Sequence, residues 1–402
     1  MKQRLACLVI FLSIILGCEN KKIYDAQKIE TELENINKAF VPDKRVAIAE
    51  AAVQQDDKSD SLSIVIKSNL QEVIDSTKDY VGQLPYPVST SFSLLPDNKA
   101  LEGKTDAVVN ISVANIRSQP KHSAELATQA TLGTPLKVLE KKGSWYRVQT
   151  PDKYISWVDE GGIIRFTPSE FNDWLKQDKI VVTEQIGYVY TEPDTKTQLV
   201  SDLTGGNVLK LIGEKNGFYE VEFPDKRQGY VPTEIAQVYK DWISNLGTSK
   251  ESLVKVSKQM LGVPYLWGGT SFKGVDCSGF TKTIYFMNGM VIPRDASQQV
   301  HAGEEIDTSN GFEALEPGDL LFFGRKATKE QAEKVVHVAM WLGNNEFIHA
   351  SGRVRINSFD PNAPNYNEYE LNRFLRAKRF LNIPQELITR LEGTRLFYNT
   401  SN

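Results

Sequence analysis

The sequence predicts an α+β chain of several domains, and three observations carry that prediction. Residues 243–381 pass from helical spacing into strand-like alternation, the order expected of an α+β domain. A stretch beginning near residue 107 repeats at a constant offset, with Trp145 matching Phe218 and Pro151 matching Pro224. With 402 residues, of which 41% are hydrophobic, the chain can bury a core in more than one domain.

The first residues predict an export signal. Lys2 and Arg4 precede the apolar run 5–16, which is too short to span a bilayer comfortably. The run ends at Gly17-Cys18 and resembles a bacterial lipobox, in which the cysteine becomes lipidated. We expect residues 1–17 to be a lipoprotein signal peptide and Cys18 to anchor the protein in a membrane of the cell envelope, facing the periplasm or the cell surface. An ordinary secretory signal is the alternative.

Cysteine usage and charge narrow the class of protein. Of the three cysteines, Cys7 lies in the signal and Cys18 carries lipid, so Cys277 is left as one free thiol without a disulfide partner. Such a thiol is either used or buried. The net charge of −4 makes no case for nucleic acid as a partner. We expect no cofactor and no metal, and the oligomeric state has no signal in the sequence.

Composition and spacing divide the rest of the chain. Residues 18–105 form a tether and a small α/β segment, with a strand expected at 45–49. Each copy of the repeat consists of short alternating segments split by Gly, Pro and Asp. This pattern predicts two small antiparallel barrels. The expected domains are a first barrel at 106–165, a linker helix and second barrel at 166–242, an α+β domain at 243–381, and a tail at 382–402.

The barrels resemble bacterial SH3-like domains. The first copy has Asn115-Ile116-Arg117 at the usual start, whereas the second has Tyr188-Val189-Tyr190 there. Barrels of this kind bind ligands in some proteins and serve as scaffolding in others, and both roles stay open.

Cys277 follows a glycine-rich loop and precedes helical spacing. Phe280, Ile284 and Met287 fall on one helical face, which places Cys277 at or beside a helix N-terminus. Unpaired amides and the macrodipole there predict a lowered thiol pKa and a reactive thiolate. A buried structural cysteine is the alternative.

Two of the four histidines lie on one predicted hairpin after Cys277. Cys277, His337 and His349 can act as nucleophile, base and orienter. The two imidazoles must then share one face of the sheet. A two-residue Asn344-Asn345 turn would place His349 opposite Met340 and His337 on the other face. The hypothesis therefore predicts a three-residue loop or an equivalent bulge.

Residues 250–380 resemble the NlpC-type (NlpC/p60) family of papain-like cell-wall cysteine peptidases. Ala339 stands where that family usually has glycine. With the lipobox and paired barrels, the whole chain resembles γ-D-glutamyl-L-diamino acid endopeptidases that recycle murein peptides. The motifs that carry the resemblance are Pro264-Tyr265-Leu266-Trp267-Gly268-Gly269, Asp276-Cys277-Ser278-Gly279-Phe280, Pro293-Arg294, Pro317-Gly318-Asp319-Leu320, His337-Val338-Ala339 and Phe347-Ile348-His349-Ala350.

The resemblance implies a mechanism and a substrate. The Cys277 thiolate, held as an ion pair by His337, would attack the γ-D-glutamyl carbonyl of a murein peptide, with His349 orienting His337. Tyr265 and the Cys277 amide would assist at the oxyanion, and Asp276 and Ser278 would bind the amine of an N-terminal L-Ala. The remaining substrate residues that it implies are Trp267 and Ser297, with Glu125 and Tyr154 from the first barrel.

Other classes of function stay open. The protein could hydrolyse intact peptidoglycan in an open groove, transfer lipid acyl groups, or bind the wall without catalysis. The barrels and the lipobox speak against acyl transfer, and the complete triad speaks against a non-catalytic module. One Cys and two His without a carboxylate at ligand spacing are a weak signal for zinc.

Overall fold

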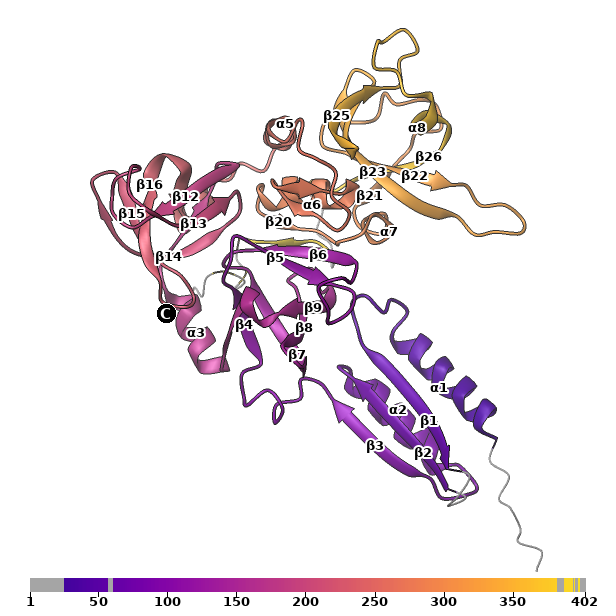
Figure 1. Ribbon diagram of the computed structural model, residues 1–402. Coiled ribbons are helices and arrows are strands. Elements are labelled where there is room, and N and C mark those ends of the chain that lie inside the picture. The colour runs from indigo at the N-terminus through magenta and orange to yellow at the C-terminus, as the bar shows by residue number, and fades with distance from the viewer. Residues whose placement is uncertain (1–24, 57–60, 382–386, 393, 395–396, 398–402) are drawn as a thin grey trace, which may run out of the picture. The chain divides into compact units, whose positions relative to one another are not determined.

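The computed structural model describes residues 25–56, 61–381, 387–392, 394 and 397 (Figure 1). The predicted signal peptide and Cys18 lie outside these residues. The chain divides into two compact units: residues up to Pro42 with Ala49–Ser93, and Asp43–Ile48 with the residues from Leu94 onward. None of the helices described is both long and apolar enough to cross a membrane. The α+β fold class is confirmed.

The first unit is a small α/β structure. Its three-stranded sheet has the order β1-β2-β3, and β2 alternates so that Leu62, Ile64 and Ile66 are buried. Helices α1 and α2 pack against each other and against the sheet. The strand expected at 45–49 is wrong, because β1 begins only at Ala49. The elements are α1 (Ala26–Phe40), β1 (Ala49–Asp56), β2 (Ser61–Ser68), α2 (Gln71–Gly82) and β3 (Ser89–Leu94).

The first barrel is a seven-stranded sheet in the order β10-β4-β7-β8-β9-β5-β6. Val109, Ile116, Val138 and Val148 meet in its core, and β5 alternates so that Ala114 and Ile116 are buried. Its strands are β4 (Asp106–Val109), β5 (Val113–Arg117), β6 (Leu126–Thr131), β7 (Pro135–Lys142), β8 (Trp145–Gln149), β9 (Ile155–Asp159) and β10 (Ile163–Phe166).

The second barrel repeats this topology in the order β13-β12-β16-β15-β14-β11-β17, although it lacks the Asn-Ile-Arg triplet. The linker helix α3 (Pro168–Lys176) before it begins with a capping box between Thr167 and Glu170. The strands are β11 (Lys179–Val182), β12 (Ile186–Tyr190), β13 (Leu199–Thr204), β14 (Val208–Lys215), β15 (Phe218–Glu222), β16 (Gln228–Pro232) and β17 (Ala236–Val238).

The last domain places helices before an antiparallel sheet in the order β21-β26-β22-β23-β24-β25. Helix α6 packs against β23 and β24 through Phe280 and Ile284, which share one core with Val338 and Ile348. Its helices are α4 (Tyr239–Asn245), α5 (Lys250–Gln259), α6 (Cys277–Phe286), α7 (Ala296–Gln299) and α8 (Glu368–Asn372). Its sheet strands are β21 (Glu304–Ile306), β22 (Leu320–Arg325), β23 (Lys334–Gly343), β24 (Glu346–Ser351), β25 (Arg353–Ser358) and β26 (Phe374–Arg379).

The C-terminal residues that the structure describes pack against this domain. β27 (Thr389–Arg390) pairs with β20 (Met290–Val291), and Leu391 and Phe397 are buried with Tyr239. Nothing in the sequence indicated this packing, because isolated apolar residues in a polar tail carry no periodic pattern.

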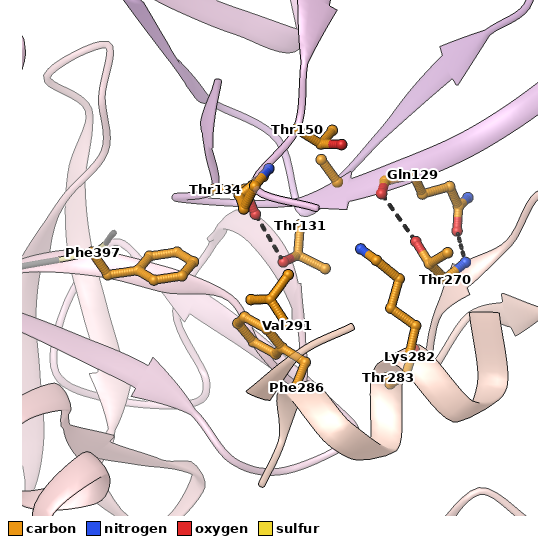
Figure 2. A pocket seen from close by; sticks show the side chains of 13 residues that line it. Gln129, Thr131, Thr134, Thr150, Thr270, Lys282, Thr283, Phe286, Val291 and Phe397 are labelled. Carbon is orange, nitrogen blue, oxygen red and sulfur yellow. Dashed lines mark hydrogen bonds between the residues drawn. The ribbon is translucent and has the colours of Figure 1, made fainter. Parts of the chain in front are cut away.

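Both barrels hold the short hairpin of β18 (Thr270–Ser271) and β19 (Gly274–Val275) that leads to α6. The Gln129 side chain accepts from the Thr270 amide at 3.0 Å, and the Gln129 carbonyl accepts from the Thr270 hydroxyl at 3.0 Å (Figure 2). Lys273 pairs with Asp202 of the second barrel. Beside Lys282, which pairs with the buried Asp152 at 3.1 Å, a cavity of only about 60 Å³ remains. The first barrel is therefore packed closely onto the helix that begins at Cys277.

Candidate active site

Cys277 is the first residue of α6, as the sequence predicted. The preceding Asp276 has an extended backbone and caps the helix by accepting from the Gly279 amide at 2.7 Å. A Cβ at Gly279 would lie 1.9 Å from the Gly269 carbonyl oxygen, so the loop and the first helical turn pack this closely only around glycine. Cys277 is buried, with 8% of the residue exposed.

Asp276 is held by a fully buried arginine that the sequence analysis did not single out for a role. Arg294 bonds both Asp276 oxygens, at 2.6 and 3.1 Å, and also the Ser278 hydroxyl at 2.9 Å. Its Nε donates to the Thr128 hydroxyl of the first barrel at 3.0 Å. The Gly268 amide binds the carboxylate as well, at 2.9 Å. The contact with Gly279 makes Asp276 the N-cap of α6. Together, the contacts with amides and with Arg294 use both oxygens of its carboxylate.

The hairpin between β23 and β24 brings both histidines to one face. Asn344 and Asn345 have positive φ angles and form a two-residue turn that pairs Gly343 with Glu346. The register then shifts by one residue at Leu342, so that Trp341 pairs with Phe347. This bulge restores the parity that the shared site requires, as the sequence predicted.

The two imidazoles belong to a continuous hydrogen-bonded chain. His337 Nε2 lies 2.8 Å from His349 Nδ1, and His349 Nε2 lies 2.9 Å from Asn357 Oδ1 on β25. Asn357 was missed by the sequence analysis. It lies two positions from Arg355, the partner of His349 across β24 and β25, so strand parity could have pointed to it once the register was known.

A buried carboxylate lies beside this chain. Glu370 of α8 pairs with Arg373 at 2.8 Å, and its Oε1 is 3.9 Å from His337 Nε2. His337, His349 and Glu370 could offer three ligand atoms within 4.8 Å of one another. One nitrogen of each imidazole bonds the other ring, and the carboxylate is paired with Arg373.

Burial controls the charge of the nucleophile and the base. It raises the pKa of the Cys277 thiol to about 12, with Asp276 adding to the rise and the Val338 and Ser278 amides opposing it. Burial, followed by His349 and two arginines, holds the pKa of His337 well below its usual value. The pKa of His349 falls to about 4, mainly through burial. The predicted lowering of the thiol pKa is therefore wrong, because desolvation outweighs the helix N-terminus. Both shifts favour the uncharged forms of the thiol and the imidazole.

A cavity of about 420 Å³ opens at Cys277 between the first barrel and the last domain. The Trp267 indole donates to the Glu125 carboxylate across it at 2.6 Å. Every residue that the resemblance assigned to substrate lines this cavity together with Cys277: Glu125, Tyr154, Tyr265, Trp267, Asp276, Ser278 and Ser297.

Arg45 completes the wall of the cavity and was not predicted. Its Nη1 bonds Asp295 at 2.7 Å and the Ser297 hydroxyl at 2.9 Å, while Asp43 pairs with its other side at 2.8 Å. The Arg45 carbonyl accepts from the Ile155 amide of the first barrel at 2.7 Å. Sequence spacing could not indicate this contact, because Arg45 and Ser297 are distant in the chain and share no motif.

Comparison with known proteins agrees with the geometry. The model of the NlpC/P60 family matches residues 262–376, and the model of the bacterial SH3 domain matches residues 112–163. The gamma-D-glutamyl-L-lysine dipeptidyl-peptidase of Bacillus cereus is 32% identical over 266 residues, which cover 64% of this chain and 76% of that protein. A murein DD-endopeptidase/murein LD-carboxypeptidase of Escherichia coli is 31% identical over 162 residues, covering 39% of this chain and 79% of that one.

A crystal structure of an NlpC/P60 family protein from Bacillus cereus has the same arrangement, with a TM-score of 0.58 and 27% identity over 69% of this chain and 99% of that one. Residues 262–376, which the NlpC/P60 family model matches, contain the thiol, the histidine hairpin and the glycine-rich loop described above. The chain belongs to the NlpC/P60 family and is a cell-wall cysteine peptidase.

Proposed function

We propose that this peptidase hydrolyses the γ-D-glutamyl-L-diamino acid bond of short murein peptides that begin with a free L-Ala. One observation carries the proposal: the first barrel walls the cavity at Cys277 and places the Glu125 carboxylate there. A relative of 32% identity is named as a gamma-D-glutamyl-L-lysine dipeptidyl-peptidase, which supports this class of bond.

The proposed chemistry starts from the uncharged pair. His337 takes the thiol proton as the Cys277 sulfur attacks the γ-carbonyl, and the imidazolium then returns that proton to the leaving amine as the C–N bond breaks. Water, activated by the same imidazole, hydrolyses the thioester. The Cys277 amide at the start of α6 stabilises the developing oxyanion, assisted by Tyr265, which lines the same cavity. His349 acts as a positioning residue.

Glu125 is the main proposed partner of the substrate ammonium. The Asp276 oxygens are taken up by Arg294 and two amides, and Asp295 pairs with Arg45. Trp267 fixes Oε1 of Glu125, an oxygen of an exposed carboxylate at the cavity wall. A contact between this exposed carboxylate and an ammonium contributes about 0.5–1 kcal/mol, or roughly two- to fivefold in affinity.

The test compares three substrates by mass spectrometry of the products. A free L-Ala-γ-D-Glu-diamino acid peptide should be cleaved at the γ-bond. The same peptide acetylated at L-Ala should lose roughly two- to fivefold in kcat/KM through the lost charge, and the added bulk should lower kcat/KM further. Intact sacculi should release nothing. Equal cleavage of the free and acetylated peptides, or release of products from sacculi, would replace the proposal with an open-groove hydrolase of intact peptidoglycan. The Escherichia coli relative is named as a murein DD-endopeptidase and murein LD-carboxypeptidase.

We also propose that the protein is a lipoprotein of the cell envelope, on the basis of the lipobox-like Gly17-Cys18. Labelled palmitate should enter the wild-type protein, and the Cys18→Ala variant should stay unlabelled and leave the membrane fraction. Labelling of that variant would remove the proposal.

A further inference from the structure

We propose that Asn357 is a positioning residue that fixes which nitrogen of each catalytic-site imidazole carries the proton. It stands at the far end of a chain that runs from His337 through His349 to Asn357 and the Asn365 carbonyl. The direction of every hydrogen bond in this chain follows from its last member.

The Asn365 carbonyl sets the orientation of the Asn357 amide. It accepts from Asn357 Nδ2 at 2.9 Å, and a backbone carbonyl can only accept. The amide nitrogen must therefore face Asn365, which turns Oδ1 toward His349. The same carbonyl also accepts from the Ser358 amide at 3.0 Å, so it is itself held in place by the backbone of β25.

The Asn357 oxygen then sets the tautomer of His349. Oδ1 is an acceptor only, so His349 Nε2, at 2.9 Å, must carry the hydrogen. A neutral imidazole has one N–H, and His349 Nδ1 is consequently a lone pair. It can only accept from His337 Nε2 at 2.8 Å.

His337 is left with its Nδ1 unprotonated, which is the state that a general base requires. Glu370 acts in the same direction, because its Oε1, 3.9 Å from His337 Nε2, also favours hydrogen on that nitrogen. The opposite tautomer of both rings would place a hydrogen on His337 Nδ1 and remove the base. The charged groups facing the pair, Arg355, Arg373 and Glu370, do not replace the Asn357 acceptor at His349 Nε2.

The tautomers can be read without any substrate. The chain has only four histidines, so the spectrum of the whole ¹⁵N-histidine-labelled protein contains few imidazole signals. His122 and His301 are exposed, which distinguishes them from the two buried rings. Both buried rings should show a protonated Nε2 and an unprotonated Nδ1 at neutral pH. A protonated Nδ1 on either His337 or His349 in the wild type would overturn the proposal, even if every variant failed to fold.

Variants of Asn357 test the consequence for catalysis. These kinetic measurements rest on the proposed function, whereas the ¹⁵N spectrum of the histidines does not. Asn357→Leu should lower kcat about ten- to a hundredfold with KM unchanged, and should populate Nδ1–H on His349. Asn357→Asp keeps an acceptor, so it should restore the tautomer and move the acid limb of the rate profile to higher pH. Asn362→Leu, an exposed asparagine of the following loop, is the matched control. Unchanged kcat and tautomers in Asn357→Leu would refute the positioning role.

Discussion

At the scale of single residues, each buried ionisable group of the active site is either paired with an opposite charge or favoured in its uncharged form. Arg294 is 1% exposed and compensates Asp276, and the pair could not be broken from one side without leaving a buried charge. The thiol and the base avoid this cost because burial favours their uncharged forms. Charge therefore develops at Cys277 only when a substrate carbonyl is present to receive it.

The uncharged pair predicts a particular pH profile. Because the pKa of His337 lies well below 6.5, the base stays unprotonated in mild acid, and the acid limb of kcat/KM should lie below pH 6.5. The raised thiol pKa should keep the plateau level to at least pH 9, the ordinary value for a thiol. An acid limb at or above pH 6.5 would indicate an ion pair instead.

Unfolding must be followed in the same pH series. The folded-state pKa of His349 is about 4, below its ordinary 6.5, so the unfolded chain binds this proton more readily. The stabilisation is complete above pH 6.5 and is lost as the pH falls toward 4. Circular dichroism at each pH separates loss of the base from loss of the fold.

The nucleophile can be tested with two small replacements. Cys277→Ala should abolish hydrolysis while circular dichroism and the melting temperature stay close to wild type, because the thiol is a small buried group. Cys277→Ser should also be inactive, since a hydroxyl is a far weaker nucleophile here. Turnover by the alanine variant would exclude Cys277 as the nucleophile.

At the scale of elements, the bulge at Leu342 decides whether the two histidines meet. A regular two-residue hairpin would place His349 opposite Met340, and a one-residue register change turns every side chain to the other face. The turn and the bulge together therefore act as one functional element.

Deleting Leu342 tests this element. The strands should pair without the bulge but keep Trp341 opposite Phe347, so His337 should stay on the face of His349 and kcat should stay within about threefold of wild type. Asn345→Gly is the control, because glycine adopts its positive φ of 60° and the hairpin should persist. A folded deletion variant without activity would show that the site needs the bulged residue itself and not only the register.

The sequence predicted that the hairpin needs an odd shift in register, but not whether a loop or a bulge supplies that shift. Alternation along β23 and β24 required an odd shift, but a three-residue loop and a two-residue turn with a bulge satisfy it equally. Asn344 and Asn345 both tolerate positive φ, so the turn type had no separate signal. The catalytic trio was predictable because Cys277 and the two histidines fall in local patterns, whereas Asn357 and Glu370 enter the site only through sheet register and helix packing.

At the scale of the whole molecule, the cavity is assembled from segments far apart in the chain. The first barrel contributes Glu125 and Tyr154, and residues 43–48 contribute Arg45. Barrel patterning predicted the two small sheets, but their contacts with the last domain depend on single polar pairs such as Arg294 with Thr128. Such pairs follow from tertiary geometry and have no local sequence signal.

Arg45 gives a prediction at this scale. Arg45→Ala should release Asp295 and Ser297 and raise KM for the free peptide about five- to tenfold, with kcat little changed, since the pair is partly exposed. Arg45→Lys should recover only part of this loss, because an ammonium cannot bond Asp43 in two places and still reach Ser297. Lys44→Ala, beside it and exposed, is the control. An unchanged KM in Arg45→Ala would separate residues 43–48 from substrate binding.

The burial of Cys277 also bears on oxidation. Peroxides and disulfides attack a thiolate, and an exposed one most readily. A cysteine that is 8% exposed, with a thiol pKa raised to about 12, offers them very little of that species. We therefore expect the thiol to react slowly with peroxides and disulfides, so the same burial that lowers the pKa of His337 also protects the sulfur from oxidation.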